Sequence, residues 1–289
     1  MRRRSFASIG LMAAVLVAAL PAIAGDTPAR PQRIVSLDLC TDQLLVELVP
    51  RTRIAAVTHL AADATVSAIP DKALGITVTH GAAEDVLRFD PDLVLAGPFG
   101  VPATVDLLRR LGKRVVVVPQ PQDLEGVRSV VQVVASAVGA EAEGAAMIAD
   151  FDHRLARLAA MRQQQALKPG AIVYQVGGVV AGPGSLADAA IAAAGFRNLA
   201  REYYTTRGGQ VPLEMLLAHP PDLLVLSSAP DEYRTALADN LRHPAVALVR
   251  RRRASVELPW RLWLCGTPHI MEAVEQLAAA RVRIQARSP

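Results

Sequence analysis

One phrase in this chain is written twice, 130 residues apart. Residues 84–95 read EDVLRFDPDLVL and residues 214–225 read EMLLAHPPDLLV, so both follow the pattern E-x-x-L-x-x-x-P-D-L and continue with aliphatic residues. In each copy the stretch before the proline fits a short amphipathic helix, and the apolar run after it is typical of a buried parallel strand. A helix that feeds a strand twice predicts two similar α/β lobes, each with one glutamate at the start of its short helix.

The rest of the chain alternates between short apolar strands and helices. With 289 residues, 52% of them hydrophobic, the chain has ample apolar surface for real cores. A repeated βα series predicts mainly parallel sheets covered by helices. The expected elements are strands at 33–37, 53–57, 76–78, 93–96, 114–118, 171–175 and 254–256, and helices at 41–48, 83–88, 103–111, 124–138, 186–194, 235–241 and 268–282.

A long helix is expected between the two halves. Residues 140–165 carry apolar side chains at helical spacing for about 25 residues, or about 37 Å, before a Pro-Gly pair ends the pattern. Because this stretch is not rich in Gly, Ser or Pro, we interpret it as a rigid strut. The predicted fold is therefore α/β, with two βα lobes joined by one long helix. The predicted boundaries are an N-terminal lobe at 31–139, a connecting helix at 140–167 and a C-terminal lobe at 168–289.

The first 24 residues are typical of a secretory signal. Three arginines precede an apolar run at residues 9–20, and small residues at 22–24 form a cleavage site before Gly25. The apolar run is too short for a comfortable membrane anchor. We therefore expect export to the periplasm, with a mature chain that starts at residue 25.

Charge argues against a nucleic-acid partner. Loss of residues 1–24 removes three of the 31 Lys and Arg and none of the 27 Asp and Glu, so the mature chain has 28 bases and 27 acids. The only dense basic run, residues 250–253, is short and lacks interleaved aromatic residues, so we interpret it as a solvated loop.

The two cysteines, Cys40 and Cys265, leave two alternatives open. An exported chain permits a disulfide between them. They lie in opposite halves, however, and can pair only if the fold brings their Cα atoms within about 7 Å. Otherwise they are two partly buried thiols.

Scarce aromatic residues cluster in two places. Only 4% of the chain is aromatic, yet Trp260 and Trp263 stand close together, and Tyr203, Tyr204 and Arg207 form a second group. Such clusters favour a pocket that stacks on a large ringed ligand, with arginines (here also Arg261) available for carboxylates.

Metal binding and catalysis have weaker support. His59, His80 and Cys40, with Asp38, follow predicted strands of the first half, so they could face one cleft and bind a free transition metal. Polar loop residues are the ordinary explanation for these positions.

Motifs for nucleotide binding and catalysis are missing. The glycine-rich stretch from residue 176 matches no phosphate-binding motif, so nucleotide binding is not favoured. Ser185 has no identifiable base, so an exported hydrolase is not favoured either, and we expect no enzyme.

Several motifs in this order resemble the substrate-binding proteins of ABC importers, of the helical-backbone class that serves ferric siderophores, haem and cobalamin. They are the opening RIVSL at 33–37, the two repeated phrases, the strut, AGPGSLAD at 181–188 with AGFRN at 194–198, and WLCGTP at 263–268. The resemblance implies that a bulky metal chelate binds in a cleft between the lobes, with no cofactor, in a monomer. The ligand-binding residues it implies are Asp38, His59, His80, Phe99, Val179, Tyr204, Arg207, Trp260 and Arg261.

The resemblance also gives a role to the repeated glutamates. A carboxylate at a helix start is favoured by the helix dipole, and this alone could explain Glu84 and Glu214. The same offset in both lobes is what docking to a two-fold partner requires. In the family, one glutamate per lobe meets arginines on the paired transmembrane permease subunits, which implies that role for Glu84 and Glu214.

Overall fold

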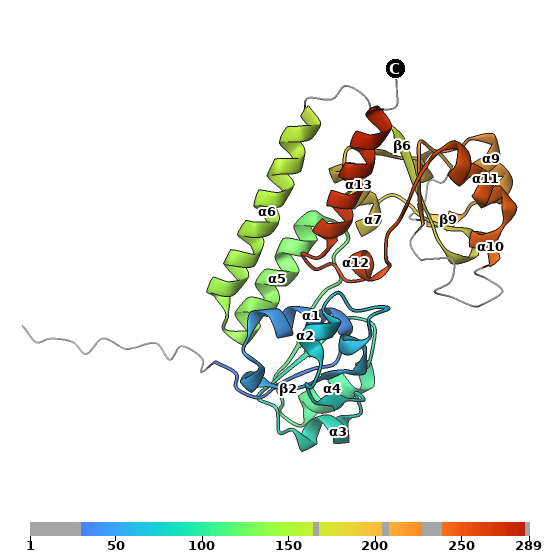
Figure 1. The fold of residues 1–289 in the computed structure, drawn as a ribbon. Coiled ribbons are helices and arrows are strands. Elements are labelled where there is room, and N and C mark those ends of the chain that lie inside the picture. Colours follow the sequence, from blue (N-terminus) through green and yellow to red (C-terminus); the bar gives the residue numbers. More distant parts are fainter. Residues whose placement is uncertain (1–29, 164–167, 204–207, 227–238, 287–289) are drawn as a thin grey trace, which may run out of the picture.

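The computed structural model describes residues 30–163, 168–203, 208–226 and 239–286. It has two α/β lobes, one above the other in Figure 1, with long helices along one side. The predicted signal segment lies outside the described residues. No helix in the described ranges has the length and apolar character needed to cross a bilayer.

The N-terminal lobe is built on a parallel sheet of five strands in the order β3-β2-β1-β4-β5. Alternate residues of each central strand enter different cores: Leu93 and Leu95 face one, Val94 and Ala96 the other. Both faces are therefore covered by helices, as the apolar runs predict. The elements are β1 (Ile34–Ser36), α1 (Leu39–Leu48), η1 (Arg51–Arg53), β2 (Ile54–Thr58), η2 (His59–Ala62), α2 (Pro70–Ala73), β3 (Val78–Thr79), α3 (Ala83–Arg88), β4 (Leu93–Ala96), α4 (Pro102–Arg110), β5 (Val115–Val117) and α5 (Leu124–Val138).

The C-terminal lobe repeats this plan with one change. Its parallel part is β11-β10-β6, flanked by β8, while β7 and β9 are antiparallel to their neighbours. The elements are β6 (Gly170–Tyr174), η3 (Val176–Gly178), β7 (Val179–Ala181), α7 (Leu186–Ala193), β8 (Arg197–Asn198), α8 (Ala200–Tyr203), β9 (Gly208–Gln210), α9 (Leu213–Ala218), β10 (Leu223–Leu226), α10 (Asp239–Arg242), α11 (Pro244–Arg252), β11 (Ala254–Glu257), α12 (Arg261–Leu264) and α13 (Ile270–Gln285).

The duplicated phrase forms the same unit in both lobes. A six-residue helix, α3 or α9, leads into a central strand, β4 or β10. The aspartate after the proline ties that strand to its neighbour: Asp92 accepts from the backbone N–H of Arg33 at 3.0 Å, and Asp222 accepts from Gly170 N–H at 2.7 Å. The Pro-Asp-Leu part of the phrase is thus explained by strand pairing.

Two sequence expectations need correction. The glycine-rich stretch from residue 176, where no strand was expected, contains strand β7: Val180 pairs with Tyr174 on one side and with Gly209 on the other. Arg250 to Arg252 do not lie in a loop but in the last turn of α11, where cations are favoured by the helix dipole. Of the helix expected at 235–241, residues 235–238 lie outside the described ranges, and α10 begins at Asp239.

The long helix α6 (Glu141–Gln163) contacts both lobes. Its 23 residues pack against α5 and α13, and Figure 1 shows it running along the side of the molecule. Met147 and Ile148 pack on the N-terminal core, whereas Phe151 and Leu158 lie in the C-terminal core. The helices α5, α6 and α13 therefore form one layer along this side of both lobes.

Candidate ligand cleft

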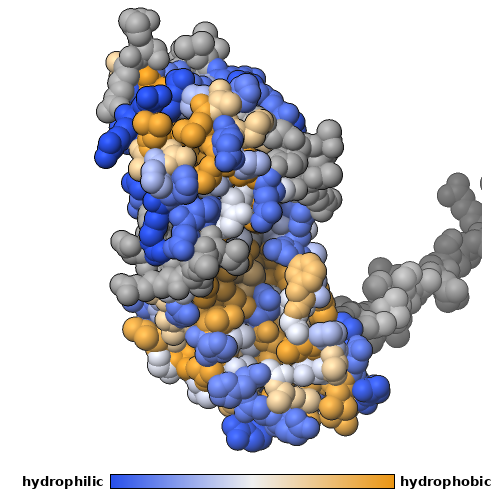
Figure 2. Space-filling view, turned by 90° about the vertical axis from the view of Figure 1, so that its right-hand side faces the viewer, coloured by the Kyte–Doolittle hydropathy of each residue, from blue (hydrophilic) through white to orange (hydrophobic). Residues whose placement is uncertain are grey.

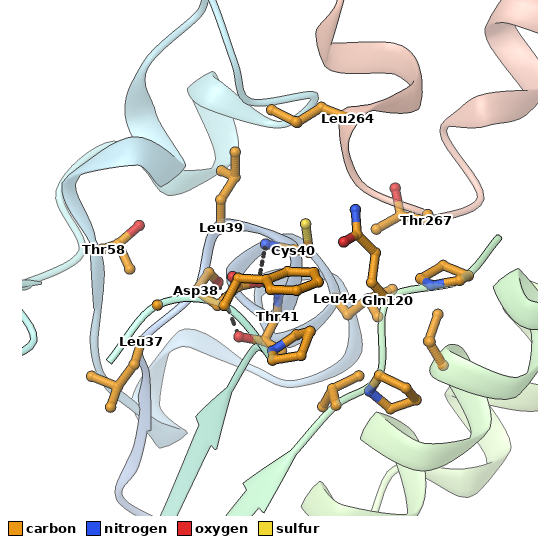
Figure 3. Close-up of a pocket in the computed structure, with 18 of the residues that line it drawn as sticks. Leu37, Asp38, Leu39, Cys40, Thr41, Leu44, Thr58, Gln120, Leu264 and Thr267 are labelled. Atoms are coloured by element: carbon orange, nitrogen blue, oxygen red, sulfur yellow. Dashed lines mark hydrogen bonds between the residues drawn. The ribbon is translucent and has the colours of Figure 1, made fainter. Parts of the chain in front are cut away.

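A cavity of about 370 Å³ lies where the two lobes meet. One wall is formed by residues that directly follow β1, β2, β4 and β5, the place where α/β sheets bind ligands. The other wall comes from the end of α12 and the residues after it, and Figure 3 shows Leu264 and Thr267 across the cavity from Leu37. The lining residues are Leu37, Asp38, Leu39, Cys40, Thr41, Leu44, Thr58, Leu60, Pro98, Phe99, Gly100, Val118, Pro119, Gln120, Pro121, Val130, Leu264, Gly266 and Thr267.

This first cavity is mainly apolar. Leucine, valine and proline side chains make up most of its wall, and hydroxyl and amide groups at Thr41, Thr58, Gln120 and Thr267 supply polar contacts. Of the described residues that line it, only Asp38 carries a charge. Figure 2 shows hydrophobic surface near the waist between the lobes, in addition to patches on each lobe. Apolar walls with a few placed polar groups are typical of sites for small organic ligands.

A second cavity of about 270 Å³ adjoins the first on the side of the C-terminal lobe. The two share Gln120, Pro121 and Leu264. Trp260 and Trp263, the only tryptophans of the chain, both line the second cavity. The Trp263 indole N–H is buried and has no hydrogen-bond partner among the described residues. The remaining lining residues are Gln122, Gln175, Ala181, Ser185, Leu186 and Ala187.

A disulfide joins Cys40 of α1 to Cys265, directly after α12. Their Cα atoms are 5.1 Å apart although the residues are separated by 225 positions. Of the two alternatives left open by the sequence, the fold therefore realises the disulfide, because it places the start of α1 against the C-terminal lobe.

These observations describe an interlobe cleft on a two-lobed α/β scaffold, and sequence comparison gives the family. Residues 34–250 match the family described as periplasmic binding protein. The chain belongs to this family.

Relatives of this periplasmic binding protein agree with that assignment. A cobalamin-binding protein of Halobacterium salinarum is 28% identical over 205 residues, which cover 70% of this chain and 56% of the relative. The chain therefore spans about half the length of the curated relatives it matches.

Solved structures share the fold. The periplasmic haem-binding protein RhuT from Roseiflexus sp. RS-1, in its apo form, superposes with a TM-score of 0.71 at 22% identity, covering 88% of this chain and 98% of RhuT. A periplasmic haem-binding protein from Pseudomonas aeruginosa gives a TM-score of 0.67 at 25% identity, covering 86% of this chain and 92% of that protein.

The cleft of the periplasmic binding protein contains three of the predicted ligand-binding residues. Asp38 and Phe99 line the first cavity and Trp260 the second. Phe99 is 75% exposed. The Asp38 carboxylate also has a structural task, because it caps α1 by accepting from Cys40 N–H at 2.9 Å, and a side chain at Gly97 would overlap it.

The other predicted residues are placed differently. His59, His80, Val179 and Arg261 line neither cavity, and both histidines are exposed. They follow predicted strands in sequence, but neither belongs to a cavity wall: His59 begins η2, whose Leu60 lines the first cavity, and His80 lies in the turn before α3. Tyr204 and Arg207 lie outside the described residues.

The alternative site for a free metal ion is not assembled. The sulfur of Cys40 is bonded to Cys265 and is not a thiolate that could bind a metal. Within the described ranges, no three His, Cys, Asp or Glu side chains come together as a set of metal ligands. This corrects the grouping of His59, His80 and Cys40 expected from their positions after strands.

Ser185, considered as a nucleophile, caps a helix. Its hydroxyl donates to Gly182 C=O at 2.8 Å and accepts from Asp188 N–H at 3.2 Å at the start of α7. A serine engaged in this way has the environment of an N-cap, not that of an activated nucleophile.

Sequence reasoning missed several lining residues. Gln120 and Pro121 directly follow the predicted strand 114–118, so their position past a strand end was a usable signal. Gly266 and Thr267 lie in the other lobe, and their place in the cleft depends on how the lobes meet. No local pattern in the sequence carries that information.

Proposed function

We propose that this protein captures a bulky metal chelate in its interlobe cleft and delivers it to the transmembrane subunits of an ABC importer in the periplasm. The observation that carries the proposal is a pair of adjoining, mainly apolar cavities of about 370 and 270 Å³ between the lobes of a periplasmic binding protein. Relatives named for cobalamin or haem binding support a chelate of that size class.

The cleft chemistry suits a ligand with a large apolar face. Leucine and proline side chains offer flat apolar contact, and Trp260 offers an indole ring at the far end. Amide groups at Gln120, Gln122 and Gln175 can pair with amide or carbonyl groups on the ligand. A bare metal ion would leave most of this surface unused, so we expect the ligand to be a chelate. We also expect a binding protein and not an enzyme.

Delivery would use the repeated glutamates. Glu84 and Glu214 are each the second residue of a six-residue helix, each is exposed, and neither forms a hydrogen bond or ion pair with a described residue. The fold uses the aspartates of the phrase for strand pairing but leaves these carboxylates free for a partner. We propose that they meet basic residues on the two permease subunits.

The test is a calorimetric titration of residues 25–289 with cyanocobalamin, haemin, ferric hydroxamate and catecholate siderophores, and the bare ions Zn²⁺, Mn²⁺ and Fe³⁺. The cleft predicts that one chelate binds at one per protein with a dissociation constant of about 1 μM or lower. Binding of a bare ion alone, or of nothing in the panel, would contradict the proposal.

A further inference from the structure

The first helix meets the C-terminal lobe along a single face. Cys40, Gln43 and Glu47 are spaced three and four residues apart on α1, which places them in one row. Opposite them, every second residue of the segment after α12 makes a contact: Cys265, Thr267 and His269. We call these six residues the interlobe joint.

The three contacts of the joint differ in kind. Cys40 and Cys265 form the disulfide. The Thr267 hydroxyl donates to Oε1 of Gln43 over 3.4 Å, and both side chains are fully buried. Nε2 of His269 lies 3.0 Å from Oε2 of Glu47, with only 18% and 13% of the two side chains exposed. Polar contacts in such shielded places are costly to break because their partners are left without water.

Charges around the pair favour its ionised form. Burial alone would lower the pKa of His269, but the hydrogen bond and charge of Glu47, with Glu272 at 3.5 Å, outweigh it and raise that pKa. Burial likewise opposes ionisation of Glu47. The effects of His269 and of Lys72, whose Nζ lies 2.6 Å from Oε1 of Glu47, outweigh this burial and lower the pKa of the Glu47 carboxyl. Both shifts therefore favour the charged forms of His269 and Glu47 over the neutral ones.

Gly266, between Cys265 and Thr267 of the joint, lies close to the ring of Pro121. A side chain at this position would overlap Pro121 of the N-terminal lobe, so only glycine allows the approach. Gly266 and Pro121 both line the first cavity. A close approach of the two lobes therefore lies in the cavity wall, in the same segment that carries Cys265 and Thr267.

The joint and the cavity share residues. Cys40 and Thr267 belong to both, and Thr41 and Leu44 line the cavity from the same helix as Gln43. Along the helical side of the molecule, α5 links the two cores, because Val127 lies in the C-terminal core and Val130 in the N-terminal core. The helical layer links the lobes on one side, and the joint links them beside the first cavity.

We infer that the interlobe joint is the positioning element of the ligand cleft: it fixes the separation of the two walls, so breaking it widens the cleft and weakens binding. The part about affinity rests on the proposed function, whereas the part about lobe separation does not. A purely stabilising disulfide would act by restricting the unfolded chain, and its loss would lower stability without changing the cleft of the folded protein.

The first arm of the test needs no ligand. Spin labels on unnatural residues at Asp106 of α4 and Arg251 of α11, both exposed, report the distance between lobes by pulsed electron paramagnetic resonance. Four samples are compared with the oxidised protein: the protein after reduction with a phosphine, the Cys40→Ser/Cys265→Ser variant, Glu47→Gln and Gly266→Ala. We expect a broader or longer distance distribution in all four, with Glu47→Gln the smallest change.

The second arm measures affinity for whichever of cyanocobalamin, haemin or the ferric siderophores the oxidised protein binds. We expect a loss of about tenfold or more for the reduced protein and for Gly266→Ala. Glu257→Gln is the matched control for Glu47→Gln, because it removes an ion pair to Arg250 of 2.9 Å that lies within one lobe. The control should leave both distance and affinity unchanged.

The outcomes separate the two proposals. If the oxidised protein binds no chelate, the proposed function fails while the distance arm still decides whether the joint holds the lobes. If the oxidised protein binds and the reduced protein binds equally well, the joint does not position the cleft, whatever the distances show. An unchanged distance distribution in the folded, reduced protein overturns the inference directly, and this sample requires no substitution that might prevent folding.

Discussion

Asp42 is a fully buried carboxyl on α1, behind the wall of the first cavity. Burial raises its pKa to about 7, against hydrogen bonds from Ser36 and from the hydroxyl and backbone N–H of Thr58 that favour the charged form. An aspartate with a raised pKa costs stability once it ionises. Nothing in the sequence around Asp42 distinguishes it from the helix-start acids of exposed helices, since its burial follows from the packing of α1.

Asp42→Asn should therefore stabilise the protein in a pH-dependent manner. Near pH 4 the carboxyl is largely protonated in the folded state, and the cost of its charge grows as pH rises from there to about 7. We expect the variant to gain about 1 kcal/mol or more in free energy of unfolding at pH 8 relative to its change at pH 4.5, measured by urea denaturation. Asp106→Asn, an exposed acid, is the control. An equal effect of Asp42→Asn at both pH values would show that the carboxyl is not held in its neutral form.

Single residues also mark where sequence reasoning stops. Asp38 could be placed in the cleft because it follows the first strand, and Trp260 because scarce aromatic residues cluster there. The same rule was applied to His59 and His80, which line neither cavity, because a residue after a strand reaches a cavity only if the next turn points it inward. That turn depends on packing that a single sequence does not display.

At the scale of elements, the acidic residues of the duplicated helix-strand unit have two different explanations. Asp92 and Asp222 hold neighbouring strands in register, so their recurrence is explained by the fold. Glu84 and Glu214 recur at the same place without such a contact. Their recurrence is what the docking proposal explains.

The double variant Glu84→Ala/Glu214→Ala should leave chelate affinity unchanged and abolish stimulation of the importer's ATPase in proteoliposomes, because two attractive contacts would be lost. Glu141→Ala/Glu143→Ala is the matched control, since it removes two exposed acids from the first turn of α6. Importer stimulation that survives loss of Glu84 and Glu214, or falls equally in the control, would refute the docking role.

Elements with strong periodicity were predictable, and weak ones were not. Apolar runs at 93–96 and 115–117 and the helix at 124–138 follow directly from their patterns. β7 and β9 were not expected, because they lie in glycine-rich sequence. α11 was missed because its arginines suggested a solvated loop.

At the scale of the molecule, the cleft exists because two similar lobes meet at an angle set by a helical layer and a joint. The lobes and the long helix could be anticipated from the repeat and the strut pattern. The pairing of Cys40 with Cys265 could not, because residues 225 positions apart are brought together only by the relative placement of the lobes. The same placement decides that Gly266 and Thr267 line a cavity made largely by the other lobe.

Tryptophan fluorescence tests the central claim, that a chelate binds between the lobes, most directly. Both tryptophans of the chain line the second cavity, so the signal of residues 25–289 reports on the cleft alone. Titration with the chelate that binds by calorimetry should quench this emission in a saturable way, with a smaller amplitude in Trp260→Phe. A chelate that binds by calorimetry yet leaves the emission of both tryptophans unchanged would place its site elsewhere and contradict the account.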